Sequence, residues 1–286
     1  MIKIASKNIN FLEKVSKIPV LKHFFILKIS ENFNDIKSEL VLNKFYRDIW
    51  VNDKTSKKTE KKRFSDLDIP SFELMKENKD YIIHDIAVSN GICSNDFYEL
   101  LAEKKKKFEF YISDKFAEIK VKKGFITKAY DNENHLIFAY AGCFYAADKN
   151  TFFPLTVLLF KLLQKNKTPE KFDYSLLLLH PEVSEKVKKK KFKFISYDIF
   201  NTEIHEKFTF VRAMNILNLG YFNEDKIRTA VINIKKSMKE NAVLLVGRTN
   251  AKKINNASFF RKQNNKLAHL KDINEGSEIK KIIENL

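Results

Sequence analysis

The stretch YIIHDIAVSNGICS, residues 81–94, has the residue types that a ligand-binding turn needs. An apolar run ends in Asp85, small residues follow, and a helix is expected to begin near Asn95. α/β proteins bind phosphates or nucleosides at such strand-to-helix turns, because the first amides of the helix face the ligand. The turn contains a single glycine, Gly91, so these residues leave open whether it is a ligand loop or a plain connection.

Three more polar residues lie at the ends of apolar runs later in the chain. Asp114 follows FEFYIS, Asp198 lies in FKFISYDIF, and Asn215 lies in FTFVRAMNIL. Parallel strands end at one edge of a sheet, and open sheets bind their ligands beyond that edge. The loops after Asp85, Asp114, Asp198 and Asn215 are therefore where we expect chemistry.

Short apolar runs alternate with amphipathic segments from residue 80 onward. The expected strands are 81–88, 108–113, 192–200, 208–217 and 242–247, and the expected helices are 95–107 and 223–241. This alternation predicts an α/β fold with a doubly wound, mostly parallel, Rossmann-like sheet. Residues 257–273 predict a C-terminal antiparallel hairpin that turns at Asn264–Asn265.

Two domains are expected. Residues 1–79 predict an N-terminal helical segment followed by a basic, exposed loop. Residues 80–286 predict the main domain, with a hairpin and a helix inserted at about 118–165. Because the insertion interrupts the alternation of strands and helices, we expect it to shape a substrate pocket.

The run DIAVSNG, residues 85–91, resembles the D/E-x-G-x-G-x-G turn of class I S-adenosylmethionine-dependent methyltransferases. Ala87 and Ser89 occupy the first two glycine positions, where small side chains keep the backbone close to a ligand. The resemblance implies that Asp85, Ala87, Ser89 and Gly91 belong to the binding site for S-adenosylmethionine.

The same resemblance extends to the next two strand ends. It implies that Asp114 accepts hydrogen bonds from both ribose hydroxyls of S-adenosylmethionine. It also implies that Asp198 reads the adenine amino edge, while Ile199 packs on the ring.

Residues 211–249 resemble a region of chemotaxis-receptor-type methyltransferases, and GSEI, residues 276–279, resembles related uncharacterised bacterial proteins. Asn215, Leu217, Tyr221 and Phe222 match an R-N-x-L-x-Y-F signature, although two extra residues precede Tyr221. Asn241 and the alanine after it replace the paired glycines of a later P-G-G-x-L-x-x-G strand, and Asn241 could still adopt a left-handed turn. The resemblance covers about residues 80–286.

Two residues are candidates for catalysis. Methyl transfer from a sulfonium donor mainly requires positioning, so no obligatory base is expected. We expect Asn215 to orient the acceptor or the donor's methionine end, and Arg212 to bind an anionic group of the acceptor. The alternatives are structural: Asn215 bonds the backbone, Arg212 pairs with an acid such as Glu203, and the strand-end acids cap turns. His84 points away from Asp85 on a strand and is expected in the core.

Composition limits the other functions. The formal net charge is +17, but only six of the 53 basic residues are arginines, which argues for a lysine-rich surface and against nucleic-acid recognition. Two cysteines and no histidine pair at i, i+4 spacing predict no metal site, and a reduced, cytoplasmic setting fits best. The sequence predicts neither a signal peptide nor a membrane span.

The acceptor is left open between a small molecule, a saccharide and a protein side chain. A second hypothesis is a basic protein that binds RNA or an anionic membrane on a methyltransferase fold that no longer catalyses. Residues 1–63 would then make peripheral membrane contact through their helices and lysines.

Overall fold

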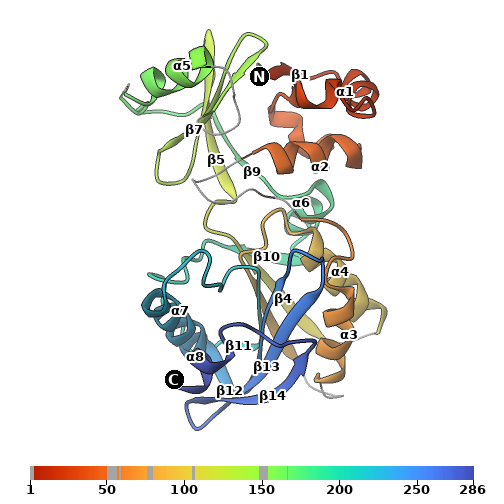
Figure 1. The fold of residues 1–286 in the computed structure, drawn as a ribbon, viewed down its shortest axis with the longest axis vertical. Helices are drawn as coiled ribbons and strands as arrows, with labels where there is room; N and C mark the ends of the chain where they lie inside the picture. Colours follow the sequence, from red (N-terminus) through yellow and green to blue (C-terminus); the bar gives the residue numbers. More distant parts are fainter. Residues whose placement is uncertain are drawn as a thin grey trace. The chain divides into compact units, whose positions relative to one another are not determined.

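The computed structural model describes residues 3–49, 57, 59–75, 80–104, 107–147, 154–165 and 167–286. The chain divides into two compact units, each built from two separate stretches (Figure 1). Unit 1 comprises Met1–Glu60 and Phe116–Ser184, and unit 2 comprises Lys61–Lys115 and Glu185–Leu286. Both units contain a sheet and helices, which confirms the predicted α/β class.

Unit 2 contains seven strands: β3 (Tyr81–Ile86), β4 (Phe108–Ser113), β10 (Phe192–Ile195), β11 (Phe208–Met214), β12 (Met238–Thr249), β13 (Asn255–Gln263) and β14 (Lys266–Ile273). They form one sheet in the order β10-β4-β3-β11-β12-β13-β14. Neighbours from β10 to β12 are parallel, and β13 is antiparallel to both β12 and β14. Later strands extend the sheet on both sides of β3, so the strand order reverses there. Open sheets bind ligands beyond the carboxyl ends of the strands at such a point.

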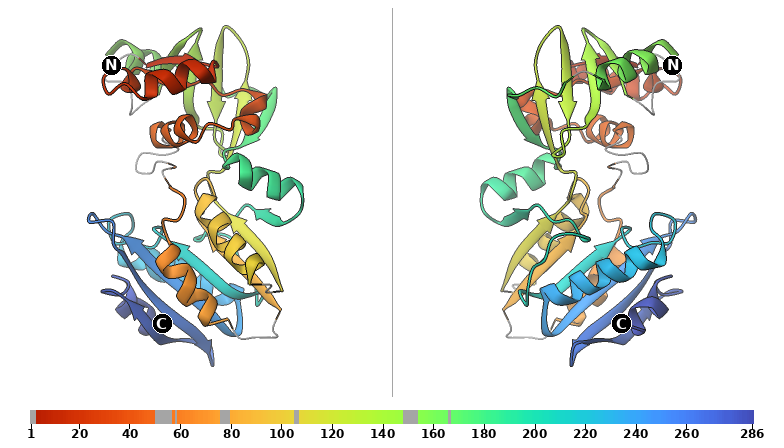
Figure 2. Two further views of the ribbon diagram at one scale, coloured as in Figure 1. Left: turned by 90° about the vertical axis from the view of Figure 1, so that its right-hand side faces the viewer. Right: turned by 90° about the vertical axis from the view of Figure 1, so that its left-hand side faces the viewer.

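Helices cover both faces of this sheet (Figure 2). They are α3 (Ser65–Glu73), α4 (Ile92–Glu103), α7 (Glu224–Ser237) and α8 (Lys280–Glu284). Phe97 of α4 packs against Phe210 on one face, with ring centres 5.9 Å apart. The next residue of β11, Val211, points to the other face and shares a buried core with Ile227 and Ile234 of α7.

α7 begins where the sequence predicts and ends earlier. Asn223 caps the helix by accepting a hydrogen bond from the Lys226 backbone N–H, as expected. The helix stops at Ser237 and β12 starts at the next residue, whereas a helix to residue 241 was predicted. Asn241 adopts φ 64° inside β12, where the β11–β12 register shifts. The expectation that Asn241 can adopt a left-handed turn is confirmed, and a continuing right-handed helix excludes this conformation.

Unit 1 has a second seven-stranded sheet, in which every pair of neighbours is antiparallel except β1 and β2. The strands, in spatial order, are β2 (Phe25–Leu27), β1 (Lys3–Ser6), β8 (Phe144–Ala146), β7 (Leu136–Ala141), β6 (Ile126–Tyr130), β5 (Glu118–Lys122) and β9 (Tyr174–Leu177). The helices are α1 (Ile9–Ser16), α2 (Glu39–Asp48), α5 (Pro154–Gln164) and the start of α6 (Pro181–Lys188), with 3-10 turns η1 (Leu21–His23) and η2 (Glu31–Asp35).

This division differs from the predicted boundary at residues 79 and 80. The N-terminal segment is not purely helical, because β1 pairs with β2 on one side and with β8 of the inserted segment on the other. Backbone hydrogen bonds to a distant strand decide this pairing, and the local pattern of apolar residues carries no information about them. α3 belongs to unit 2 although it precedes residue 80. Much of the predicted basic loop, residues 50–56 and 58, lies outside the described residues.

Within the described residues, no helix is both long enough and apolar enough to cross a lipid bilayer.

Gly247 provides a test of the packing between β11, β12 and β13. A Cβ at this position would lie 2.7 Å from the Ala257 Cβ and 2.8 Å from the Met214 Cε. We expect Gly247→Ala to lower the free energy of unfolding by about 1–3 kcal/mol, because a packed core resists an added methyl group. The measurement is thermal unfolding, with Gly124→Ala as the control, since a Cβ there meets only ordinary contacts. Equal melting temperatures for the two variants would contradict this packing.

Candidate functional site

The turn between β3 and α4 has a left-handed backbone at every second residue. Ala87, Ser89 and Gly91 have φ values of 57°, 62° and 79°. A left-handed backbone costs a residue with a side chain roughly 1–2 kcal/mol, whereas glycine adopts it freely. The turn therefore has the backbone shape that alternating glycines favour, although two of its three left-handed positions are alanine and serine. Such strain is retained where the surrounding structure or a function requires it.

The end of β4 is bonded directly to this turn. The backbone N–H of Ser89 donates to the Asp114 Oδ2 over 2.8 Å, and the N–H of Val88 donates to the Ser113 carbonyl oxygen over 3.0 Å. The structure thus brings Asp114 to the turn of Ala87, Ser89 and Gly91, from which it is 23 or more residues away in the sequence. A loop of backbone amides beside a carboxylate can bind a ligand that carries both an anion and hydroxyl groups.

Asp198 and Ile199 follow β10 in a tight turn. The Asp198 carboxylate accepts hydrogen bonds from the Phe200 N–H and the Asn201 side chain, and it lies 3.1 Å from the Lys115 Nζ. Burial tends to raise the pKa of Asp198, but these donors outweigh it and lower the pKa below its usual range. Ile199 is buried in the core shared with α7. Asp198 therefore caps a turn, which is the alternative that the sequence left open for it.

Asp85 lies in a buried charge cluster. Arg212 of β11 places its Nη1 2.6 Å from the Asp68 Oδ1 and its Nη2 3.3 Å from the Asp85 Oδ2. The Phe97 ring centre lies 4.8 Å from the guanidinium carbon, and the Arg212 side chain is 1% exposed. The expectation that Arg212 binds an anionic acceptor group is therefore corrected, because two acids inside the protein already occupy its guanidinium.

The proposed partner of Arg212 is corrected as well. Glu203 pairs with the Lys236 Nζ at 2.6 Å instead. The actual partner, Asp68, lies on α3 in a segment with no marked signal for a site, so sequence reasoning missed it.

Asn215 joins the ends of β11 and β12. It adopts φ 59°, its side-chain oxygen accepts the Thr249 N–H over 2.8 Å, and its own N–H donates to the Gly247 carbonyl over 2.8 Å. Asn215 therefore bonds the backbone, which is the structural alternative to a role in substrate binding. Its carboxamide NH₂ is the part of the side chain that can still orient a substrate.

Other buried polar groups surround this sheet edge. His84 is fully buried and its Nε2 lies 2.8 Å from the Ser113 hydroxyl, which confirms the expected core histidine. Burial lowers the pKa of His84 to about 3, so the ring is neutral. The Asn90 Nδ2 and the Tyr197 hydroxyl are buried with no hydrogen-bond partner among the described residues. Buried polar groups are nearly always bonded, so both groups call for a further partner such as a bound ligand or water.

One set of possible metal ligands occurs in the described part of the chain, formed by Glu39, His180 and Glu182 of unit 1. The His180 Nδ1 accepts the Glu182 backbone N–H over 3.4 Å, and its Nε2 lies 3.3 Å from the Glu39 Oε1. Because a backbone N–H can only donate, a neutral ring carries its proton on Nε2, facing Glu39. The three ligand atoms lie within 4.8 Å of one another, so these residues could hold a metal ion if the long bond from the Glu182 N–H to Nδ1 were given up.

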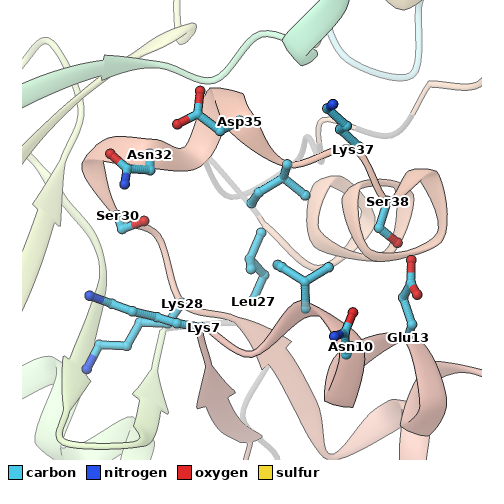
Figure 3. A pocket seen from close by; sticks show the side chains of 12 residues that line it. Lys7, Asn10, Glu13, Leu27, Lys28, Ser30, Asn32, Asp35, Lys37 and Ser38 are labelled. Carbon is cyan, nitrogen blue, oxygen red and sulfur yellow. The ribbon is translucent and has the colours of Figure 1, made fainter.

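Unit 1 also contains a surface hollow of about 630 Å³ (Figure 3). Leu27 lies at its centre, and polar side chains such as Lys7, Lys28, Asn32 and Glu13 surround it. Its volume is that of a small-molecule pocket, and its mixed charges select no ligand class.

No protein-family model matches the sequence, and no curated protein matches it. Part of the chain is similar to several solved structures. A putative S-adenosyl-L-methionine-dependent methyltransferase from Methanococcus maripaludis is 12% identical with a TM-score of 0.32, and the match covers 65% of this chain and 57% of the other. A Haemonchus contortus phosphoethanolamine N-methyltransferase is 11% identical with a TM-score of 0.32, over 64% and 28%. The cyclase SpnF is 10% identical with a TM-score of 0.32, over 64% and 44%. The chain thus spans from 28% to 57% of these structures.

The cluster of Arg212 with two acids predicts a pH dependence of stability. Burial, opposed by Arg212, raises the pKa of Asp68 from 3.8 to about 7, because one cation cannot balance two buried carboxylates. Native Asp68 therefore holds a proton that the unfolded chain has released between these two pH values. We expect the free energy of unfolding to fall as pH rises from about 4 to about 7, and then to stay constant on this account.

The measurement is denaturant unfolding across this pH range for the parent protein and for Asp68→Asn, which mimics the protonated acid. The variant should lose the fall in stability and become the more stable of the two above pH 7. Asp66→Asn on the exposed side of α3 is the matched control. An unchanged slope in Asp68→Asn would show that Asp68 is ionised throughout.

Proposed function

We propose that unit 2 is a class I S-adenosylmethionine-dependent methyltransferase on a doubly wound sheet with a C-terminal hairpin. The observation that carries the proposal is the left-handed backbone at Ala87, Ser89 and Gly91, in a turn bonded to Asp114 where the strand order reverses. A loop of this shape lets backbone amides approach a ligand closely, and α4 begins directly after it. Close binding of a ligand would explain why Ala87 and Ser89 have a strained, left-handed backbone.

The residues at this edge fit the cofactor in part. The N–H groups of Ser89, Gly91 and Ile92 are already bonded within the protein. The Asn90 NH₂, which has no hydrogen-bond partner among the described residues, would therefore hold the carboxylate of the methionine end. Asp114 would accept the ribose hydroxyls through its carboxylate, which also accepts the Ser89 N–H. Asp198 and Ile199 support adenine binding less directly, because both are engaged within the protein.

When bound, the cofactor supplies an electrophilic methyl group, and the chain positions the acceptor. We propose that Asn215 orients the acceptor through its NH₂, while its oxygen stays bonded to Thr249. The acceptor is a small molecule, a saccharide or a protein side chain. Asp85 and Arg212 contribute indirectly. Their ion pair joins β3, which leads into the turn, to β11, which leads to Asn215.

Within the methyltransferases, we propose a relation to the chemotaxis-receptor type and to similar bacterial proteins. Asn215 and Asn241 both take the left-handed conformation, and a well-capped helix connects β11 to β12. The residues before Tyr221 form a turn in which the Asn218 side-chain oxygen accepts the N–H groups of Gly220 and Tyr221. The two extra residues are therefore absorbed in a local turn.

We expect S-adenosylmethionine to bind the full chain and Asp114→Asn to weaken that binding by about tenfold or more. An amide keeps the acceptor for Ser89 but loses the charge that favours hydroxyl donors, and charge-assisted hydrogen bonds contribute about 1.5–3 kcal/mol. The measurement is isothermal calorimetry. Glu103→Gln, at the far end of α4, is the control and should bind as the parent does.

Two results would overturn parts of this proposal. If the parent protein does not bind S-adenosylmethionine, the methyltransferase function fails. If the parent binds it and Asp114→Asn binds equally well, the role of Asp114 fails and the function stands.

Asn215 is tested by Asn215→Asp, which keeps the oxygen that Thr249 uses and tolerates a left-handed backbone. The variant loses the NH₂, so we expect transfer of a labelled methyl group into a cell extract to fall by at least about tenfold with little change in donor affinity. The control is the melting temperature, which should stay close to that of the parent. Equal methyl incorporation by the two proteins would remove Asn215 from the site.

The alternative is a basic protein that binds RNA or an anionic membrane on a fold that no longer catalyses. The capped turn of Asp198 and the buried Ile199 favour it, because neither residue is free to read an adenine. Calorimetry with S-adenosylmethionine separates the two candidates, because the alternative predicts no heat of binding. The alternative also predicts a salt-dependent interaction with RNA or vesicles.

A further inference from the structure

Unit 1 exposes four large apolar side chains on two hairpin tips and a helix. Phe125, in the turn between β5 and β6, is 95% exposed, and Phe144, next to the turn between β7 and β8, is 50% exposed. Leu158 and Leu162 of α5 are each 54% exposed. Single exposed apolar residues are ordinary on protein surfaces, whereas a cluster of them indicates a binding surface.

Strand register places the two tips side by side. Ile126, directly after Phe125, pairs with Ala141, and Ala141 pairs with Phe144 on its other side. Neighbouring strands lie roughly 5 Å apart, so Phe144 is about two strand spacings from the base of the Phe125 turn. In Figure 1 both tips lie at one end of the sheet, and α5 lies beside them.

α5 lies on the face of the sheet to which Phe144 points. Phe160 and Leu163 of α5 share a buried cluster with Ala139 and Ala146. Phe144 is two residues from Ala146 on the same strand, and alternate residues share a face. Leu158 and Leu162 are four residues apart and lie on the side of α5 opposite to Phe160, so they face outward.

The segments that carry these four side chains are basic. Residues 122–128, 141–146 and 154–165 contain five lysines and no acidic residue. Lys122 and Lys123 are paired, with Asp173 and Glu31 respectively. Lys128, Lys161 and Lys165 form no ion pair within the described residues. Three lysines without an ion pair among the described residues thus lie on the same segments as the exposed apolar side chains.

We propose that this surface, the tip surface of Phe125, Phe144, Leu158 and Leu162, binds an anionic lipid membrane. Aromatic and aliphatic side chains enter the boundary between headgroups and acyl chains, and the lysine ammonium groups reach the anionic headgroups.

A second copy of this chain fits less well, because a two-fold contact would bring the same unpaired lysines together. RNA fits less well because Leu158 and Leu162 offer bases neither stacking nor hydrogen bonds. The inference is independent of the methyltransferase proposal and places the contact outside residues 1–63.

The test uses the full chain and sedimentation with vesicles of phosphatidylcholine, with and without phosphatidylserine. We expect binding only to vesicles that contain phosphatidylserine, and binding that weakens with added salt. Phe125→Ser and the double variant Leu158→Ser with Leu162→Ser should each weaken binding by about tenfold, the factor that corresponds to about 1.4 kcal/mol. Ile254→Ser is the matched control, because Ile254 is 44% exposed and belongs to unit 2, whereas the tip surface belongs to unit 1.

Melting temperatures check that the variants fold, and all replaced side chains are exposed. Failure of the parent to bind phosphatidylserine vesicles would overturn the proposal, as would equal binding by the parent and both tip-surface variants. If Phe125→Ser instead converts a dimer to a monomer in gel filtration, or abolishes binding to an RNA oligonucleotide while vesicles stay unbound, the surface has a different partner and the proposal is wrong.

Discussion

The buried guanidinium of Arg212 is the constraint on which unit 2 depends. Burying an unpaired charge costs a large free energy, so the Arg212 guanidinium needs acidic partners in fixed positions inside the protein. Asp85 at the end of β3 and Asp68 on α3 provide them, at 3.3 Å and 2.6 Å. The cluster ties a helix to two adjacent parallel strands, and it fixes the residue from which the turn at 87–91 departs.

The turn at 87–91 has a backbone shape that glycine favours, at positions held by alanine and serine. Hydrogen bonds from the Val88 and Ser89 N–H groups to the end of β4 hold Ala87 and Ser89 in this left-handed backbone. Similar logic applies at Asn215 and Asn241, since asparagine tolerates this conformation better than most residues. The edge of the sheet is therefore shaped by backbone conformation more than by particular side chains.

Unit 1 is built differently, from two stretches that complete one antiparallel sheet. β1 and β2 come from the N-terminal stretch, while β5 to β9 come from the inserted one. Because β8 and β1 pair directly, neither stretch buries its strand edge without the other. The insertion is thus a structural half of a second unit, and its α5 and hairpin tips carry apolar side chains to the surface.

The sequence by itself determined the α/β class, most strands of unit 2, the cap at Asn223 and the polar residues that end the strands. These follow from local periodicity and capping, which depend on neighbours in the chain. Only the tertiary structure decided that Asp68 pairs with Arg212, that Asp198 caps its own turn, and that residues 1–60 complete a sheet with residues 116–184. Ion pairs and strand pairing join residues far apart in the chain, and the free energy of a buried charge depends on what surrounds it in space.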